Sequence, residues 1–128
     1  MKKKASVIII YFVLGILLCI SMAYALQIQD EVLKTRYEPI LGEYEFSMSE
    51  GTFYLNFYIE EGALWADSGD GRPAEMKAFE DEMFKFKAED PQSGIFIFRF
   101  LKDDHGEFSI CHVLNEGMGL DIKGSKIK

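Results

Sequence analysis

Cysteine and histidine are scarce in this sequence, with two residues of each among 128. Cys19 lies in an apolar N-terminal run that we expect to be removed, so Cys111 has no disulfide partner within the folded domain. Zinc needs three or four nitrogen or sulfur ligands, and His105, Cys111 and His112 are the sole candidates beyond residue 25. The sequence therefore predicts no disulfide, no metal site, and a fold that depends on its hydrophobic core.

Sequence signatures of catalysis are missing as well. The chain has no G-x-S-x-G nucleophile motif and no Cys–His pair at a useful spacing. Asp67, Asp70 and Gly71 resemble the start of a calcium loop, but the glutamate that closes such a loop is absent. His105 lies in an Asp-Asp-His-Gly turn, which is typical of a solvated hairpin tip. We therefore expect neither an enzyme nor a bound cofactor.

Basic residues are outnumbered by acidic ones, 14 to 21, which gives a net charge of −7. The first 25 residues contain three lysines and no acid, so the chain without them carries a charge of −10. A protein this acidic repels phosphate backbones and anionic lipid headgroups. Nucleic acid and peripheral lipid are therefore excluded as expected partners.

The N-terminus has the pattern of an export signal. Three lysines at positions 2–4 precede an apolar run over residues 7–20, and Ala23-Tyr24-Ala25 supplies an A-x-A cleavage site. We expect residues 1–25 to be a cleaved signal peptide and the protein to be periplasmic or extracellular. The alternative is an uncleaved membrane anchor, because Val7–Leu26 is about long enough to span a bilayer. A membrane is an expected partner only in that second case.

The rest of the chain divides into a short helix and a set of strands. Apolar residues four apart predict a helix over Gln27–Glu38, within an N-terminal helix and linker of residues 26–41. From Gly42 the period changes to two and turn signals recur, which predicts a mainly β barrel over residues 42–125. Residues 74–88 also fit a helical stripe, since Ala, Glu, Lys and Met are good helix formers, so a helix there stays open beside two strands. The eight expected strands are Glu43–Met48, Thr52–Glu60, Ala63–Asp67, Ala74–Phe79, Met83–Ala88, Gly94–Lys102, Glu107–Leu114 and Gly119–Lys123.

Aromatic side chains dominate the second expected strand and predict how the barrel is filled. Tyr54 and Tyr58 should lie outside, because the residues that alternate with them are the more apolar set: Phe53, Leu55, Phe57 and Ile59. Other residues expected to point inward are Phe46, Phe86, Phe98 and Ile110. An eight-stranded barrel is narrow, so we expect a mostly filled interior that still allows a small pocket near one rim.

Several short motifs resemble a known bacterial domain. They are Tyr37, Leu41-Gly42-Glu43-Tyr44, Gly62-Ala63-Leu64, Met83-Phe84, Ile97-Phe98 and Asp104-His105-Gly106-Glu107-Phe108. The sequence over residues 37–125 is similar to a small secreted lipocalin-like domain of unknown function that often follows serine-β-lactamase-like (penicillin-binding-protein-like) hydrolase domains. The resemblance implies an eight-stranded antiparallel lipocalin-like barrel preceded by a short helix. It implies no catalytic residues.

Two polar residues in the expected strands could act from either face of the barrel. If Phe98 points inward, Arg99 faces outward; in the opposite register Arg99 would enter the barrel, where its guanidinium could hold a carboxylate. The first register is favoured because burying a charge without compensation is costly. His112 has the same parity as Ile110, so we expect it to point inward.

We expect a monomeric, exported binding module of unknown specificity that recognises a partner protein or an envelope component through its loops or outer face. One alternative is a carrier of a small apolar ligand, and a more distant one is an accessory or inhibitor of an envelope hydrolase. The candidate binding residues are Tyr54, Tyr58, Trp65, Arg99 and His112.

The A-x-A motif leads to a prediction about processing. The exported protein should begin at Leu26, because Ala23 and Ala25 are the small residues that a signal peptidase requires. Intact mass spectrometry of protein from its own host measures this directly. Recovery of the whole chain from the membrane fraction would instead establish the anchor.

Overall fold

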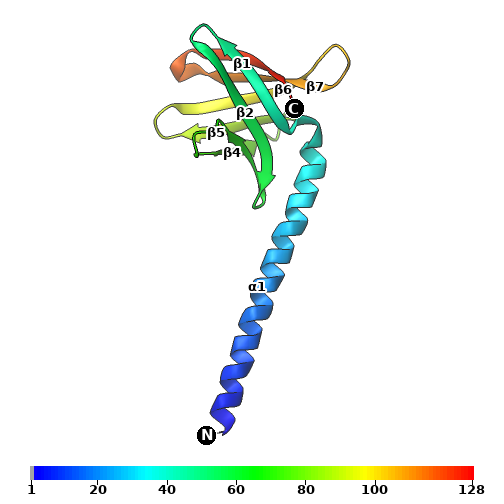
Figure 1. Ribbon diagram of the computed structural model, residues 1–128, viewed down its shortest axis with the longest axis vertical. Coiled ribbons are helices and arrows are strands. Elements are labelled where there is room, and N and C mark those ends of the chain that lie inside the picture. The colour runs from blue at the N-terminus through cyan, green and yellow to red at the C-terminus, as the bar shows by residue number, and fades with distance from the viewer. Residues whose placement is uncertain (1) are drawn as a thin grey trace.

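The computed structural model describes the backbone of residues 2–128 and the side chains of residues 13–128. A long N-terminal helix leads into a β-barrel, and the C-terminus lies close to the point where the helix joins it (Figure 1). The helix α1 spans Lys2–Tyr37, and a short 3-10 helix, η1 (Glu38–Ile40), connects it to the barrel. The remaining elements are β1 (Gly42–Met48), β2 (Gly51–Glu60), β3 (Ala63–Asp67), β4 (Ala74–Ala78), β5 (Lys85–Asp90), β6 (Gly94–Lys102), β7 (Phe108–Asn115), η2 (Glu116–Met118) and β8 (Leu120–Lys126).

The eight strands form a closed barrel in which every strand is antiparallel to its neighbours in chain order. β8 returns to pair with β1, with Phe46 opposite Gly124, so the sheet has no free edge. This confirms the predicted antiparallel barrel preceded by a helix. Residues 74–88 contribute to two strands, not a helix. β5 begins at Lys85 instead of the expected Met83, because Phe84 adopts a left-handed φ of 59°.

The barrel interior is a cluster of aromatic rings. Phe46, Phe57, Phe86 and Phe98 are all buried, as predicted, with at most 5% of each residue exposed. The ring of Phe57 lies 4.9 Å from that of Phe100, in an edge-to-face arrangement that favours aromatic pairs. Phe53 stacks on Phe46 at 5.0 Å. The inward and outward faces of β2 therefore follow the predicted alternation.

β7 does not follow the predicted alternation. The inward residues of this strand are Cys111, Val113 and Asn115, whereas Ile110 and His112 are half-buried on the outer face, so their predicted inward positions are wrong. The reason is a register shift between Leu101 and Lys102, which places one extra residue in β7 between Phe108 and Ile110. Phe108 therefore still packs against the core. Beyond the extra residue the alternation is shifted by one position, so Cys111 points inward in place of Ile110.

One end of the barrel is closed by the segment that connects α1 to β1. Ile40 is fully buried there, and the Tyr44 hydroxyl donates a 2.8 Å hydrogen bond to its carbonyl. Burial raises the pKa of Tyr44, so this phenol remains a donor. Tyr37, in the last turn of α1, places its ring edge-to-face against Phe84 and Phe86 at 6.3 and 5.3 Å. Aromatic side chains thus seal the end of the barrel nearest the helix.

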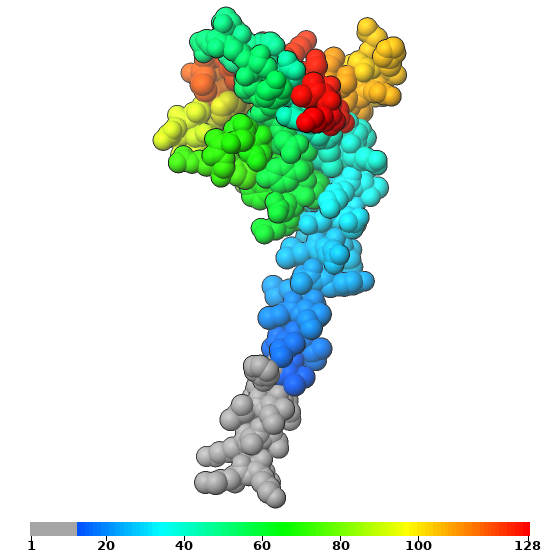
Figure 2. All heavy atoms as spheres, viewed as in Figure 1, coloured from blue at the N-terminus to red at the C-terminus, as the bar shows by residue number. Residues whose placement is uncertain are grey.

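α1 docks on the barrel only through its last turns. The Asp30 carboxylate accepts a hydrogen bond from the Gly62 backbone N–H in the β2–β3 turn, and Leu33 packs against the core. Before these contacts, the part of the helix over residues 13–28 is exposed and stands clear of the barrel (Figure 2). Val13–Ile40 includes an apolar stretch, none of it buried, that is long and apolar enough to cross a membrane. The expected signal segment and the expected short helix are therefore one continuous helix, which is compatible with either a signal peptide or an anchor.

Phe98 provides a test of the core. Replacing it with alanine should lower the free energy of unfolding by about 3–5 kcal/mol, because a buried ring is removed from a closed interior. Ile95→Ala is the control on the same strand, since Ile95 is 52% exposed, and it should change stability by about 0.5 kcal/mol or less. Chemical denaturation measures both. A Phe98→Ala loss as small as that of the control would contradict the inward register of β6.

Gly124 provides a test of barrel closure. A Cβ atom at this position would lie 2.6–2.7 Å from ring atoms of Phe46, which is fully buried and cannot move aside. Gly124→Ala should therefore cost about 1–3 kcal/mol by overpacking. Gly117→Ala is the matched control, because its Cβ would meet nothing nearer than Asn115 Oδ1 at 3.5 Å. Equal stability of the two variants would show that β1 and β8 do not approach as described.

Candidate binding site at the open end of the barrel

The two ends of the barrel differ in how they are covered. The turns over residues 61–62, 79–84 and 103–107 lie at the helix end, beside η1 and the C-terminus. The connections over residues 49–50, 68–73, 91–93 and 116–119 lie at the opposite end, because antiparallel strands alternate in direction. α1 contacts β2, β3 and η1. The second end carries the short η2 but is not covered by α1, and we call it the open end.

A hollow of about 220 Å³ lies inside the open end. Its walls are mainly apolar side chains that point inward from seven of the eight strands: Phe53, Leu55, Ala66, Ala74, Ala88, Phe96, Phe98, Val113 and Leu120. Its rim is polar and consists of Ser68, Asp70, Arg72, Glu89 and Asp90. The arrangement is that of a small ligand pocket, with apolar walls and a few polar groups at the entrance.

Three alanines account for the space. Ala66 and Ala74 are opposite each other in the β3–β4 ladder, and Ala88 is opposite Phe96 in the β5–β6 ladder. Residues opposite one another in a ladder share a face, so all three point inward on adjacent strands. A methyl group fills little of the lumen, whereas the facing wall carries phenylalanine and leucine. The hollow is therefore a consequence of side-chain volume and not of a gap in the sheet.

Local hydrogen bonds hold the rim in place. Asp70 Oδ1 accepts from the Arg72 backbone N–H at 2.9 Å, and Asp90 Oδ1 accepts from the Gln92 N–H at 2.8 Å. The buried Asn115 amide donates to the Ser93 carbonyl at 2.8 Å, which ties β7 to the β5–β6 turn. These contacts give the entrance a defined shape before any ligand binds, which lowers the entropic cost of binding.

The titratable side chains that line the hollow are the carboxylates and the guanidinium of its rim. Its lining contains no histidine, cysteine or lysine. Within the described residues, no group of three His, Cys, Asp or Glu side chains is arranged to hold a metal ion. Cys111 is buried deep in the barrel, and burial raises the pKa of its thiol, which keeps it protonated.

The predicted aromatic candidates lie outside the barrel, away from the hollow. Tyr58 and Trp65 are opposite each other in the β2–β3 ladder, and Tyr54 is 44% exposed on the same outer face. The Trp65 indole donates to the Glu60 carbonyl at 2.8 Å. Partial desolvation and the nearby Asp67 carboxylate raise the pKa of the Tyr58 phenol. These side chains form an aromatic outer face, defined by Tyr54, Tyr58 and Trp65.

The predicted polar candidates lie outside as well, on β6 and β7. Arg99 faces outward, as the favoured register predicts, and its guanidinium lies 3.2 Å from the Glu82 carboxylate. It therefore does not enter the barrel to hold a carboxylate. His112 is opposite Arg99 in the β6–β7 ladder, and its Nε2 contacts Asp121. The structure thus divides the five candidates between two outer faces and brings none of them to the hollow.

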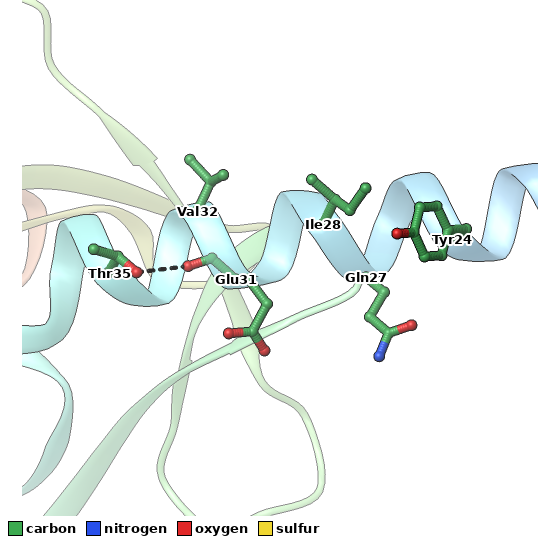
Figure 3. A pocket seen from close by; sticks show the side chains of 6 residues that line it. All are labelled: Tyr24, Gln27, Ile28, Glu31, Val32 and Thr35. Atoms are coloured by element: carbon green, nitrogen blue, oxygen red, sulfur yellow. Dashed lines mark hydrogen bonds between the residues drawn. The ribbon is translucent and has the colours of Figure 1, made fainter.

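A wider groove runs along the outside of α1, beside Tyr24, Ile28 and Val32 (Figure 3). Its lining side chains all come from this one helix and are all exposed. Thr35 donates a 3.0 Å hydrogen bond to the Glu31 carbonyl within the helix. Because no second element forms an opposite wall, this groove is an exposed helix surface, and the hollow lined by seven strands is the stronger candidate site.

Comparison of the chain with protein-family models, with curated proteins and with solved structures gives no match. The resemblance to a lipocalin-like domain therefore stays a prediction, and the function must be argued from the geometry of the molecule itself.

Proposed function

We propose that this protein is a non-enzymatic binding module that holds a small apolar group in the open end of its barrel. The observation that carries the proposal is the difference between the two ends. At the helix end aromatic rings and the buried Ile40 occupy the lumen, and a hollow of about 270 Å³ lies beside α1 and the turn over residues 79–84. At the open end a hollow of about 220 Å³ lies among inward side chains from seven strands, behind a polar rim. A preformed hollow with apolar walls and a polar rim is suited to binding a small ligand.

The volume limits the size of the ligand. An apolar cavity of about 150 Å³ is enough to accept benzene, whereas drug-sized ligands occupy pockets of about 300–1,000 Å³. A hollow of about 220 Å³ therefore suits a single ring with a short substituent, or one apolar side chain of a partner. A membrane lipid with full-length acyl chains is too large for it.

We place the barrel outside the cytoplasm. The support is the apolar stretch of α1, which follows a basic N-terminus at Lys2–Lys4, the pattern that leaves the downstream domain on the outer side. Cleavage before Leu26 and retention as an anchor give the same location for the barrel. Both also keep Asp30, Leu33 and Tyr37, which dock the end of α1.

The aromatic outer face supports a second candidate function, recognition of a partner protein. Tyr and Trp are enriched among the residues that dominate binding energy at interfaces, and Tyr54 presents 44% of its surface to solvent. This is the outer-face recognition expected from the sequence. An accessory or inhibitory role toward an envelope hydrolase has no independent structural support and stays a prediction.

The proposal is tested by filling the hollow. Ala88→Leu should abolish binding of phenylpropanol, a neutral single-ring probe, because the added side chain occupies the space that Ala88 leaves. Binding is measured on the full chain in detergent micelles from shifts of backbone amide NMR signals of Leu55, Val113 and Leu120. Partition of the probe into micelles is the same for both proteins and cancels in the comparison.

Ala63→Leu is the matched control, because Ala63 pairs with Glu60 at the helix end of β3, away from the hollow. It should leave the probe-induced shifts unchanged. If phenylpropanol perturbs no residue of the hollow in the unmodified protein, or perturbs it equally in Ala88→Leu, the proposed function is wrong and the aromatic outer face becomes the leading site.

A further inference from the structure

We infer that the ligand of the hollow carries a positive charge: a small apolar amine, with its ring or chain inside and its ammonium group at the rim. This inference rests on the proposed function, because it identifies the class of ligand for the same hollow. It is carried by the distribution of charge around the entrance.

The rim contains more negative than positive charge. Asp70 and Asp90 line the entrance with the single guanidinium of Arg72, whereas Glu89 lies on the outer face of β5 and pairs with Lys87. Charges farther away contribute little, because the Debye length is about 8 Å at physiological ionic strength. An ammonium at the entrance therefore meets a net attraction, whereas a carboxylate there would meet one favourable guanidinium and two unfavourable carboxylates.

The rim carboxylates also have free acceptor capacity. Asp70 and Asp90 each use Oδ1 to accept backbone N–H groups of their own loops, and no described side chain donates to their Oδ2 atoms. Glu89 is not counted among these acceptors, because it lies on the outer face of β5, 3.8 Å from the Lys87 ammonium. An ammonium has three N–H donors, so it can donate hydrogen bonds to the Oδ2 atoms of Asp70 and Asp90 without disturbing the loop hydrogen bonds.

The competing reading is an anionic head held by Arg72. This guanidinium is exposed, and among the described side chains it forms no ion pair, so it could donate hydrogen bonds to a ligand carboxylate. A solvated guanidinium loses little by staying unpaired, however, and exposed ion pairs are individually weak. The balance is therefore decided by the number of charges at the entrance, and the two carboxylates of Asp70 and Asp90 outweigh one guanidinium.

The test compares three probes that share one ring and differ in the head group: phenylpropylamine, phenylpropanol and phenylpropionate. Each is titrated into the full chain in a neutral detergent and into the double variant Asp70→Asn/Asp90→Asn. Asparagine keeps the Oδ1 acceptor that the loops need and removes only the charge. The measured quantity is the ratio of affinities between the two proteins for each probe, in which micelle partition cancels.

The double variant should bind the amine about two- to tenfold more weakly, the alcohol equally well, and the carboxylate more tightly. In the unmodified protein, salt of about 1 M, where the Debye length is about 3 Å, should weaken the binding of the amine alone.

The Arg72→Gln variant should bind the amine more tightly, and this result does not depend on whether the aspartate variants fold. Asp104→Asn, in the turn at the helix end, is the control and should change none of the affinities.

The outcomes separate the two proposals. If the alcohol binds in the hollow but the amine is unaffected by charge removal, or if the carboxylate binds most tightly, the inference about the ligand's charge is overturned and the proposed function stands. If none of the three probes perturbs the hollow, the proposed function is wrong, and the inference that rests on it is wrong as well.

Discussion

The packing of Phe98 and Phe100 against Phe57 is the interaction on which the rest of the barrel depends. The rings lie 5.9 and 4.9 Å from that of Phe57, so β6 and β2 meet across the lumen. Once these phenylalanines point inward, the ladder places Val113 and Cys111 inward on β7, because paired residues share a face. Small side chains there, and Gly124 beside Phe46, make room for the rings. The positions of the outward residues follow from the same register.

Side-chain volume is distributed unevenly along the barrel. At the helix end, Phe84 packs edge-to-face on Phe108 at 4.7 Å and also contacts Tyr37, so rings occupy the lumen. At the open end, alanines replace rings on the β3, β4 and β5 wall. The backbone needs no distortion to create a binding site here, since the choice between alanine and phenylalanine at inward positions is sufficient. Filling one end stabilises the fold, and leaving the other end partly empty provides the space in which we propose that a ligand binds.

The sequence allowed the barrel, its eight strands and the two faces of β2 to be predicted, because hydrophobic alternation is a local signal. It did not allow the parity of β7 to be predicted. The bulge between Phe108 and Ile110 is created by pairing with β6, and nothing in the local pattern marks it. A small pocket near one rim was allowed for, but its lining was not predicted, for a related reason: Ala66, Ala74 and Ala88 become neighbours only once the strands are in register. Their inward parity could be read from the alternation, but alanine in a strand gives no signal of a pocket.

The attachment of α1 determines how a ligand reaches the hollow. The helix enters the barrel at its closed end, where Asp30 bonds to the Gly62 N–H and Tyr37 covers Phe84 and Phe86. The mouth therefore faces away from the helix, and if α1 stays in a bilayer the entry route is through water and not sideways from the lipid. Release of the barrel by cleavage before Leu26 would leave those same contacts in place. The open end would then be equally accessible in either form, and processing would change how far the protein diffuses without changing the hollow.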